Sequence, residues 1–249
     1  MQIGLVTDKG LKREINQDYY GMIEENENIP YVFIIADGMG GHKAGEVASR
    51  LSVEFSLSHI RKTLNKKMSK EEIVSKLQDI VKQVNSEVYK ESLENQDNEG
   101  MGTTLIITVV MPCYVIIAHV GDSRVYVFRE QELKKITNDH SYVEELVKNG
   151  TITREEAKKN PNKNVLTRAV GYSEKVETDI YTYDRKEKDI FMMCTDGLTN
   201  MVDESTIKKV FLEKDKPQDI VQSLIDKSNE NGGLDNITII VFKDDEVIN

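Results

Sequence analysis

The sequence predicts a single α+β domain, and three observations support this. Short runs of consecutive apolar residues, bounded by Gly, Asp or Pro, recur along the chain and are typical of buried strands. Between them lie amphipathic stretches with apolar residues three or four positions apart, as in helices. No internal repeat, low-complexity linker or break in composition divides the 249 residues, a length that one domain can reach.

The N-terminal part is predicted to begin with strands. Residues 3–7 form a short strand, Tyr19 and Tyr20 belong to a second, and residues 32–36 form the first fully buried one. The polar residues 24–30 form the loop that precedes this buried strand.

Two helices are predicted next. A glycine-rich turn at residues 37–45 runs into a helix whose face includes Val47 and Leu51. Ser69 and Glu72 form a capping-box pattern at the start of the second helix. The apolar face of this second helix consists of Ile73, Leu77, Ile80, Val81, Val84 and Val88.

A hairpin and a polar insertion follow. Residues 103–111 and 114–120 are predicted to pair as a hairpin that turns at Pro112, and residues 124–128 add a strand. Residues 139–171 are polar, and two capping-box patterns predict two short helices within them. We interpret this segment as a flap over a site.

The C-terminal part returns to core structure. Residues 190–195 are predicted as a buried strand, and Pro217 starts a helix that ends before Gly232. Residues 236–242 form the last strand.

The amino-acid composition indicates a globular protein and argues against several classes of partner. Hydrophobic residues make up 39% and charged residues 31%, as in a soluble globular protein. The net charge of −10 argues against nucleic acid or an anionic membrane as the main partner. No apolar stretch reaches the ~18 residues of a membrane span, and the first residues lack a signal-peptide pattern, so we expect a cytoplasmic protein. Cys113 and Cys194 have no CxxC spacing, and we expect both to be buried thiols.

Aspartates stand at the ends of four apolar runs. Asp37, Asp122 and Asp196 follow such runs, and Asp235 precedes another. A single Asp-Gly pair after a strand is ordinary turn chemistry. Four similar strand ends can instead meet at one rim of a sheet core, where gathered carboxylates repel one another. Hard divalent cations, which prefer oxygen ligands, relieve this repulsion, and the pattern therefore predicts a multinuclear metal site.

Several other chemistries are excluded by their missing motifs. The chain has no GxGxxG, GxSxG or HExxH, and its histidines lack metal-ligand spacing. His59 and His119 lie in helix and strand patterns and are predicted to be structural. For His42 and His140, which lie in loops beside acids, a structural and a functional role remain open.

Seven motifs in one order carry a family resemblance. They are Arg13-Glu14-Ile15-Asn16-Gln17-Asp18, Asp37-Gly38-Met39-Gly40-Gly41-His42, Gly102-Thr103-Thr104, Gly121-Asp122-Ser123-Arg124, Asp139-His140-Ser141, Thr195-Asp196-Gly197-Leu198 and Asp235-Asn236-Ile237-Thr238. Together they resemble the metal-dependent protein phosphatases of type 2C, and the Met-Gly-Gly sequence resembles their bacterial branch.

The resemblance implies a fold and an activity. The fold is a four-layer α-β-β-α sandwich of two antiparallel sheets flanked by helices, here one catalytic domain over residues 1–249. The activity is hydrolysis of phosphoserine and phosphothreonine by direct attack of a water or hydroxide that bridges two Mn²⁺ or Mg²⁺ ions, with a third, weaker ion possible. The implied partners are phosphorylated proteins, including a serine/threonine kinase, and the chain is expected to be a monomer.

The resemblance also assigns metal ligands. Asp37 bridges two metals, the Gly38 carbonyl holds the second, and Asp196 and Asp235 complete the first. Asp18 acts nearby, directly or through water.

Two further residues receive roles from the resemblance. Asp122 helps to bind the third metal, with Asp196 as a shared ligand. Arg13 clamps the substrate phosphate, because a planar guanidinium suits bidentate contact with oxyanions. The alternative for Arg13 is a surface arginine in a charged turn.

The chain departs from the family pattern at two positions. Met39 stands where animal members carry a histidine that acts as a general acid, so the leaving group must be protonated by water at the metals or, less favourably, by His42. Gln17 replaces an acidic ligand of some members. Two alternative functions remain open: an inactive phosphoprotein-binding module on the same fold, and a metal hydrolase acting on a non-protein phosphoester.

Overall fold

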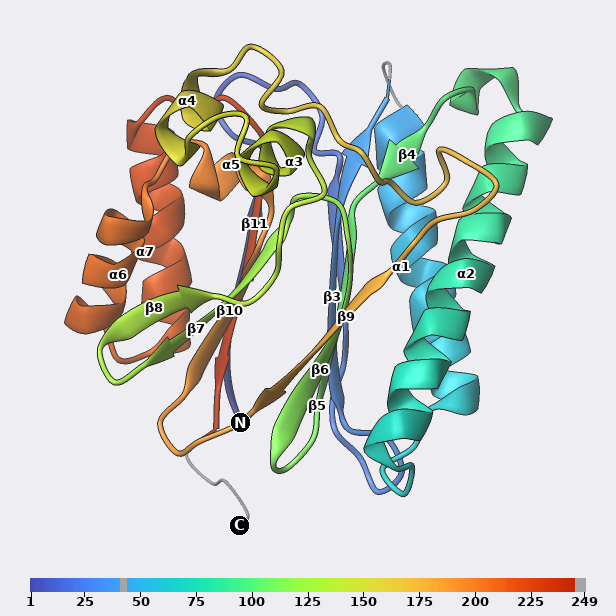
Figure 1. Cartoon of the computed structure of the whole chain (residues 1–249). Helices are drawn as coiled ribbons and strands as arrows, with labels where there is room; N and C mark the ends of the chain where they lie inside the picture. The colour runs from blue at the N-terminus through green and yellow to red at the C-terminus, as the bar shows by residue number, and fades with distance from the viewer. Residues whose placement is uncertain (41–43, 245–249) are drawn as a thin grey trace.

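Two antiparallel sheets packed between two pairs of helices make up the fold (Figure 1). The structure is a computed structural model that describes residues 1–40 and 44–244. The first sheet has the strand order β1 (Gln2–Asp8), β11 (Ile237–Lys243), β10 (Ile190–Cys194), β7 (Arg124–Arg129) and β8 (Glu132–Lys135). The second has the order β2 (Asp18–Ile23), β3 (Tyr31–Met39), β5 (Leu105–Val110), β6 (Tyr114–Val120) and β9 (Asp179–Asp184), and the short β4 (Gly102–Thr103) pairs with β3.

Helices cover the outer face of each sheet. The second sheet is covered by α1 (Ala44–Thr63) and α2 (Lys70–Glu94), and the first by α6 (Glu204–Glu213) and α7 (Pro217–Glu230) (Figure 1). The remaining helices are the 3-10 turn η1 (Gln96–Asn98), α3 (Tyr142–Lys148), α4 (Arg154–Lys159) and α5 (Asp196–Thr199). The four-layer α-β-β-α arrangement that the resemblance implied is therefore confirmed.

Stacked aromatic rings fill the space between the two sheets. The Phe242 ring of β11 lies 4.6 Å from that of Phe33 in β3 and 5.3 Å from that of Phe191 in β10, measured between ring centroids. All three side chains are buried, together with the inward-facing aliphatic residues of both sheets. Because β3 belongs to one sheet and β10 and β11 to the other, this stack ties the sheets together.

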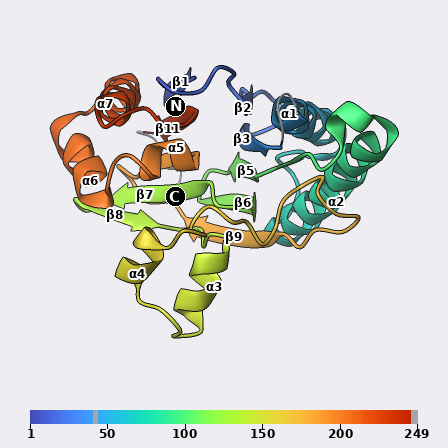
Figure 2. The same ribbon diagram turned by 90° about the horizontal axis from the view of Figure 1, so that it is seen from above.

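The helix signals read from the sequence are confirmed. Ser69 caps α2 through a complete capping box with Glu72, whose backbone N–H donates to the Ser69 hydroxyl. Pro217 occupies the first turn of α7. The polar insertion contains α3 and α4, capped by Ser141 and Thr153, and Figure 2 shows both helices projecting from the sandwich beside β8 and β9.

The structure also contains elements that the sequence did not reveal. The strands β8 and β9 lie at sheet edges, their residues are exposed or only partly buried, and neither contains a continuous apolar run. The helix α6 was not predicted either. Burial of Cys194 is confirmed, but the prediction for Cys113 is wrong, because that residue lies in the exposed turn between β5 and β6. Among the described residues, no helix combines the length and apolar composition of a membrane span.

Replacing Phe242 by Ala should lower the free energy of unfolding by about 3–5 kcal/mol, because the truncation leaves a cavity between the sheets. Urea denaturation followed by circular dichroism measures this change. The control is Leu212→Ala, which truncates a side chain that is 50% exposed on α6 and should change stability by less than about 0.5 kcal/mol. Equal effects of the two substitutions would show that the stack is not a main source of stability.

Candidate metal centre

Five aspartates meet at one rim of the sandwich. Asp18 begins β2 and pairs directly with Asp37 near the end of β3. Asp122 follows β6, Asp196 begins α5 just after β10, and Asp235 lies two residues before β11. The carboxylate of Asp37 experiences the negative charge of all four others. The structure thus brings together every acid that the sequence singled out.

Asp18 is the most deeply buried of the five. One of its carboxylate oxygens, Oδ2, accepts hydrogen bonds from the hydroxyls of Thr195 and Thr238, both at 2.8 Å. The other oxygen, Oδ1, is buried and has no hydrogen-bond partner. Burial raises the pKa of Asp18 to about 7, although the two threonine hydrogen bonds act in the opposite direction. An unpaired buried carboxylate oxygen is costly unless a cation or donor compensates it.

Burial and mutual repulsion perturb three of the other acids in the same direction. The pKa of Asp37 is raised well above its usual value by burial and then by the charge of Asp18. Burial followed by the charge of Asp196 raises the pKa of Asp122, and burial followed by the charge of Asp235 raises that of Asp196. These sites therefore hold negative charge at a cost that a cation would remove.

As placed in this structure, Asp196 and Asp37 are in side-chain hydrogen-bond contact, and two of the acids also have partners outside the cluster. Within residues 1–40 and 44–244, no three His, Cys, Asp or Glu side chains are grouped closely enough to hold a metal ion. Asp235 forms an ion pair with Arg13, and Asp196 accepts a hydrogen bond from Asn200, both at 2.9 Å. The charge of the cluster, its all-oxygen donors and the unpaired oxygen of Asp18 nevertheless fit a hard divalent cation.

Arg13 and Gly38 border the cluster in different ways. The Arg13 side chain is half exposed, and only one of its nitrogens donates to Asp235, so other donors face solvent. Gly38 lies where β3 touches the first turn of α1: a Cβ atom there would stand 2.0 Å from the Gly45 carbonyl oxygen. Any side chain at position 38 would push the helix away from the strand that carries Asp37.

Asn236 is a supporting residue to which the sequence reasoning gave no role. Its Nδ2 donates to the carbonyl oxygens of Lys9 and Ile15, both at 2.9 Å, and its Oδ1 accepts from the Gln17 backbone N–H at 2.8 Å. These bonds fix the loop that carries Arg13 against the start of β11. Its place in the Asp-Asn-Ile-Thr motif was the signal that could have identified it.

Thr104 supports Asp37 in a similar way. Its hydroxyl accepts from the Asp37 backbone N–H at 2.9 Å, and its own backbone N–H donates to the Asp37 carbonyl oxygen at 2.9 Å. The same hydroxyl lies 2.8 Å from that of Ser123, next to Asp122. The Gly-Thr-Thr motif therefore links the two segments that carry these acids.

The histidines have structural surroundings where they are described. His119 is buried in β6, and its Nε2 contacts the Ser123 carbonyl oxygen at 2.9 Å. His140, left open by the sequence, accepts from the Gly121 backbone N–H through Nδ1 and contacts Asp179 through Nε2. His42, the alternative general acid, lies outside the described residues.

Comparisons with a family profile and with known proteins identify the same family for this chain. The family profile described as protein phosphatase 2C matches residues 11–225. The chain is 41% identical over 239 residues to the serine/threonine phosphatase stp of Listeria monocytogenes, covering 96% of this chain and 94% of that protein.

Solved structures agree with the sequence matches. The S. agalactiae serine/threonine phosphatase superposes with a TM-score of 0.91 at 37% identity, covering 98% of this chain and 99% of the other. The catalytic domain of the phosphatase PstP, solved in complex with two manganese ions, gives a TM-score of 0.82 at 32% identity, with 96% of each chain covered.

Neutralising Asp37 should stabilise the metal-free protein while weakening its response to metal. Because the pKa of Asp37 is raised, its ionised form opposes folding at neutral pH by on the order of 1 kcal/mol per pKa unit. In EDTA, Asp37→Asn should therefore raise the melting temperature by roughly 2–4 °C for each kcal/mol gained. Addition of MnCl₂ should stabilise the unmodified protein and have little effect on the variant.

The matched control is Asp79→Asn, which makes the same change at an exposed position of α2. It should leave both the melting temperature and the manganese response unchanged. An Asp37→Asn protein that keeps the full manganese response would contradict the assignment of this rim as the metal centre.

Proposed function

The chain belongs to the protein phosphatase 2C family and is a metal-dependent serine/threonine phosphatase, and we propose that the five rim aspartates hold its cations. The observation that carries this proposal is the buried cluster of like charges with an unpaired oxygen on Asp18. Without cations such a cluster only destabilises the fold, and with them it becomes a binding site for a phosphate ester.

The ligand roles follow the position of each acid. Asp37, the Gly38 carbonyl, Asp196 and Asp235 would hold two ions, either Mn²⁺ or Mg²⁺, with Asp18 nearby. The charge of Asp196 raises the pKa of Asp122, so the two carboxylates are close enough to interact, and they would share a third ion. When bound, such ions supply positive charge that activates water as a nucleophile and offsets the charge of the phosphate.

Arg13 is suited to binding the substrate phosphate. It sits beside the acids through its ion pair with Asp235, and it presents unused N–H donors to solvent. A guanidinium with two parallel donors matches two oxygens of a phosphate group and stabilises the charge that moves onto them during hydrolysis.

Within residues 1–40 and 44–244, Cys194 and Thr195 beside the acids are both poor nucleophiles. Burial raises the pKa of Cys194 to about 12, so its thiol stays neutral, and the Thr195 hydroxyl donates to Asp18. The nucleophile is therefore water rather than an enzyme side chain. Met39 has no proton to donate, so we infer that the leaving oxygen is protonated by water, with His42 as the less favourable alternative.

A cavity of about 990 Å³ beside the acids is the proposed binding site for the substrate peptide. Asp122 and Asp196 line it at one end, and the segment 139–171, which we propose to be the flap, forms a wall. The base of the flap is anchored by Asp139, whose carboxylate accepts a bidentate set of hydrogen bonds from Arg124. On the flap wall, Arg154 and Lys158 are paired with Glu144 and Glu155, whereas Lys163 forms no ion pair with a described acid.

The partners follow from this reaction. We infer that phosphorylated proteins, among them a serine/threonine kinase, are the substrates, and that the chain acts as a monomer. Neither the site nor the relatives favour the inactive phosphoprotein-binding alternative.

Replacing Asp196 by Asn should abolish metal-dependent turnover. A ligand change should cost more than the 10–100-fold typical of residues behind the ligands, so we expect a loss of about 100-fold or more. The measurement is hydrolysis of a phosphothreonine peptide by EDTA-stripped protein after addition of MnCl₂ or MgCl₂. The Asp79→Asn variant should keep full activity, whereas turnover by Asp196→Asn, or without any metal, would exclude this site.

Exchanging residues 142–165 for the corresponding segment of the Listeria relative should change peptide preference. We expect the ratio of kcat/KM between two phosphopeptides to shift about tenfold, on the order of the 1–3 kcal/mol that a changed pocket contributes to discrimination. Hydrolysis of p-nitrophenyl phosphate, which is too small to reach the flap, should stay unchanged. An unchanged peptide ratio would show that the flap does not select substrates.

A further inference from the structure

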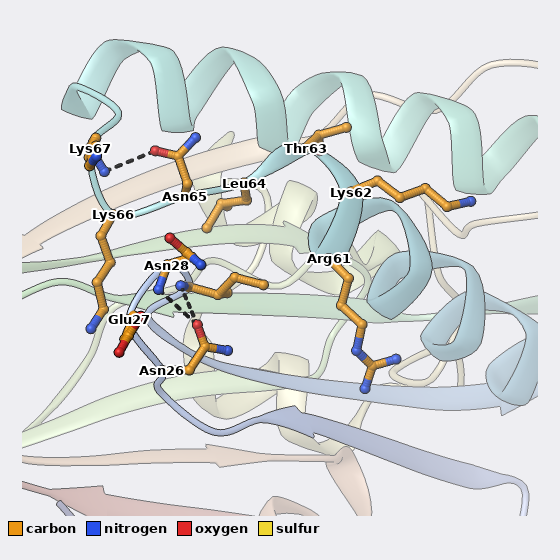
Figure 3. A pocket seen from close by; sticks show the side chains of 11 residues that line it. Asn26, Glu27, Asn28, Arg61, Lys62, Thr63, Leu64, Asn65, Lys66 and Lys67 are labelled. Carbon is orange, nitrogen blue, oxygen red and sulfur yellow. Dashed lines mark hydrogen bonds between the residues drawn. The ribbon is translucent and has the colours of Figure 1, made fainter.

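A second cavity, of about 740 Å³, lies at the other end of β3 from the aspartates (Figure 3). It is formed by the loop of residues 26–29 before β3, the last turn of α1, and the connection from α1 to α2. From Ile29 to Asp37 the chain is extended, and at ~3.3 Å per residue the cavity is roughly 25 Å from the metal centre. It is therefore separate from the site described above.

Basic residues are concentrated around this cavity. Four of the seven residues from Arg61 to Lys67 are basic, in a chain where 33 of 249 residues are Lys or Arg and the net charge is −10. Lys66 is paired with Glu25. Arg61, Lys62 and Lys67 form no ion pair with any acid in residues 1–40 and 44–244. Glu27 also lines the cavity, but no ion pair joins its carboxylate to Arg61, Lys62 or Lys67 among the described residues, so the basic side chains still outnumber the acids there.

The frame that presents these charges is well defined. The Asn26 side-chain oxygen accepts from the backbone N–H groups of Asn28 and Ile29, at 2.8 and 2.9 Å. The Lys66 backbone N–H donates to the Asn28 carbonyl oxygen at 2.8 Å, which links the loop to the segment after α1. Leu64 is buried beneath the cavity. A preformed frame lowers the entropy lost on binding.

The distribution of charge favours an extended ligand with several negative groups. Figure 3 shows Arg61 and Lys66 on opposite sides of Asn26 and Asn28, and Lys62 extending away from both. Cations that project in different directions suit a ligand with several negative groups better than one with a single charge. Arg61 and Lys62 lie in the last turn of α1, where their positive charge also offsets the negative end of the helix dipole. A peptide with carboxylates or phosphates along its length could pair with each cation in turn, and the asparagine amides could bond its backbone.

A protein segment fits better than a membrane or a nucleic acid. The cavity is concave, and its apolar residues Ile29 and Leu64 are partly or fully buried, so it offers no apolar anchor for a lipid surface. The net charge of −10 opposes binding to long anionic polymers but not to a short acidic segment.

We propose that this basic pocket, defined by residues 26–29 and 61–67, binds an acidic segment of the phosphatase's protein substrates. The part of the proposal that concerns substrates rests on the proposed function. Binding here would raise the local concentration of a phosphorylated residue at the metal centre without adding any contact there. The pocket would thus lower KM for substrates that carry an acidic segment and leave kcat unchanged.

The first test measures binding alone. A fluorescein-labelled peptide of eight Glu residues is titrated with protein at 50 mM and 300 mM NaCl, and its anisotropy gives Kd. We expect Arg61→Glu and Lys67→Glu each to raise Kd at least fivefold at low salt, with smaller effects at high salt because exposed charges are screened. The control Lys82→Glu makes the same charge change at an exposed position of α2 and should change Kd less than twofold.

The second test measures turnover with manganese. One substrate carries a phosphothreonine sequence, a Gly/Ser linker of about 20 residues that spans roughly 25 Å, and the Glu tail. A second substrate has Gln in place of each Glu of the tail. The Glu substrate should show a KM at least fivefold lower at equal kcat, and Arg61→Glu should remove this difference.

The outcomes of the two tests bear separately on the pocket assignment and on the proposed phosphatase reaction. Equal Kd increases for Arg61→Glu and Lys82→Glu, or no binding of the tail, would overturn the pocket assignment. Tighter Arg61-dependent binding of phosphatidylserine vesicles or single-stranded RNA than of the Glu peptide would overturn the assignment to protein. Tail binding that depends on Arg61 but occurs without turnover of either substrate would support the pocket and contradict the proposed reaction.

Discussion

The repulsion among five aspartates at one rim is the constraint on which the rest of the structure depends. Asp18 is buried with an unpaired oxygen, and the charge of each acid perturbs its neighbours. A fold can hold such a cluster only if its backbone is fixed independently of the acids. The stacked rings of Phe33, Phe191 and Phe242 provide that fixed frame, because they join the two sheets away from the rim.

Hydrogen bonds from uncharged side chains connect this frame to the acids at the rim. Thr195 and Thr238 from one sheet donate to Asp18 of the other, and Asn236 ties the loop before β2 to the start of β11. These groups orient the acids without cancelling their charge. The cluster therefore keeps the negative charge on which the proposed cation binding depends, at the expense of stability when no cation is bound.

The two ends of the sandwich have opposite electrostatic character. One end gathers negative charge and lies beside the polar flap, while the other displays Arg61, Lys62 and Lys67 around a polar cavity. Because the two ends are separated by the length of β3, the proposed catalytic and recognition roles can be tested by separate substitutions. This division follows from a sheet whose strand ends present different loops on opposite rims.

Much of the protein was determined by local sequence. The apolar runs specified the buried strands, Ser69 and Pro217 specified helix starts, and the order of the motifs identified the family and the acids at its centre. Tertiary structure alone decided the rest. The edge strands β8 and β9 exist because a neighbouring strand pairs with them, Cys113 is exposed because it falls in a hairpin turn, and Arg13 meets Asp235 although 222 residues separate them. Sequence patterns report the burial and propensity of neighbouring residues, whereas strand pairing, ion pairs and the basic pocket depend on distances that only the folded chain sets.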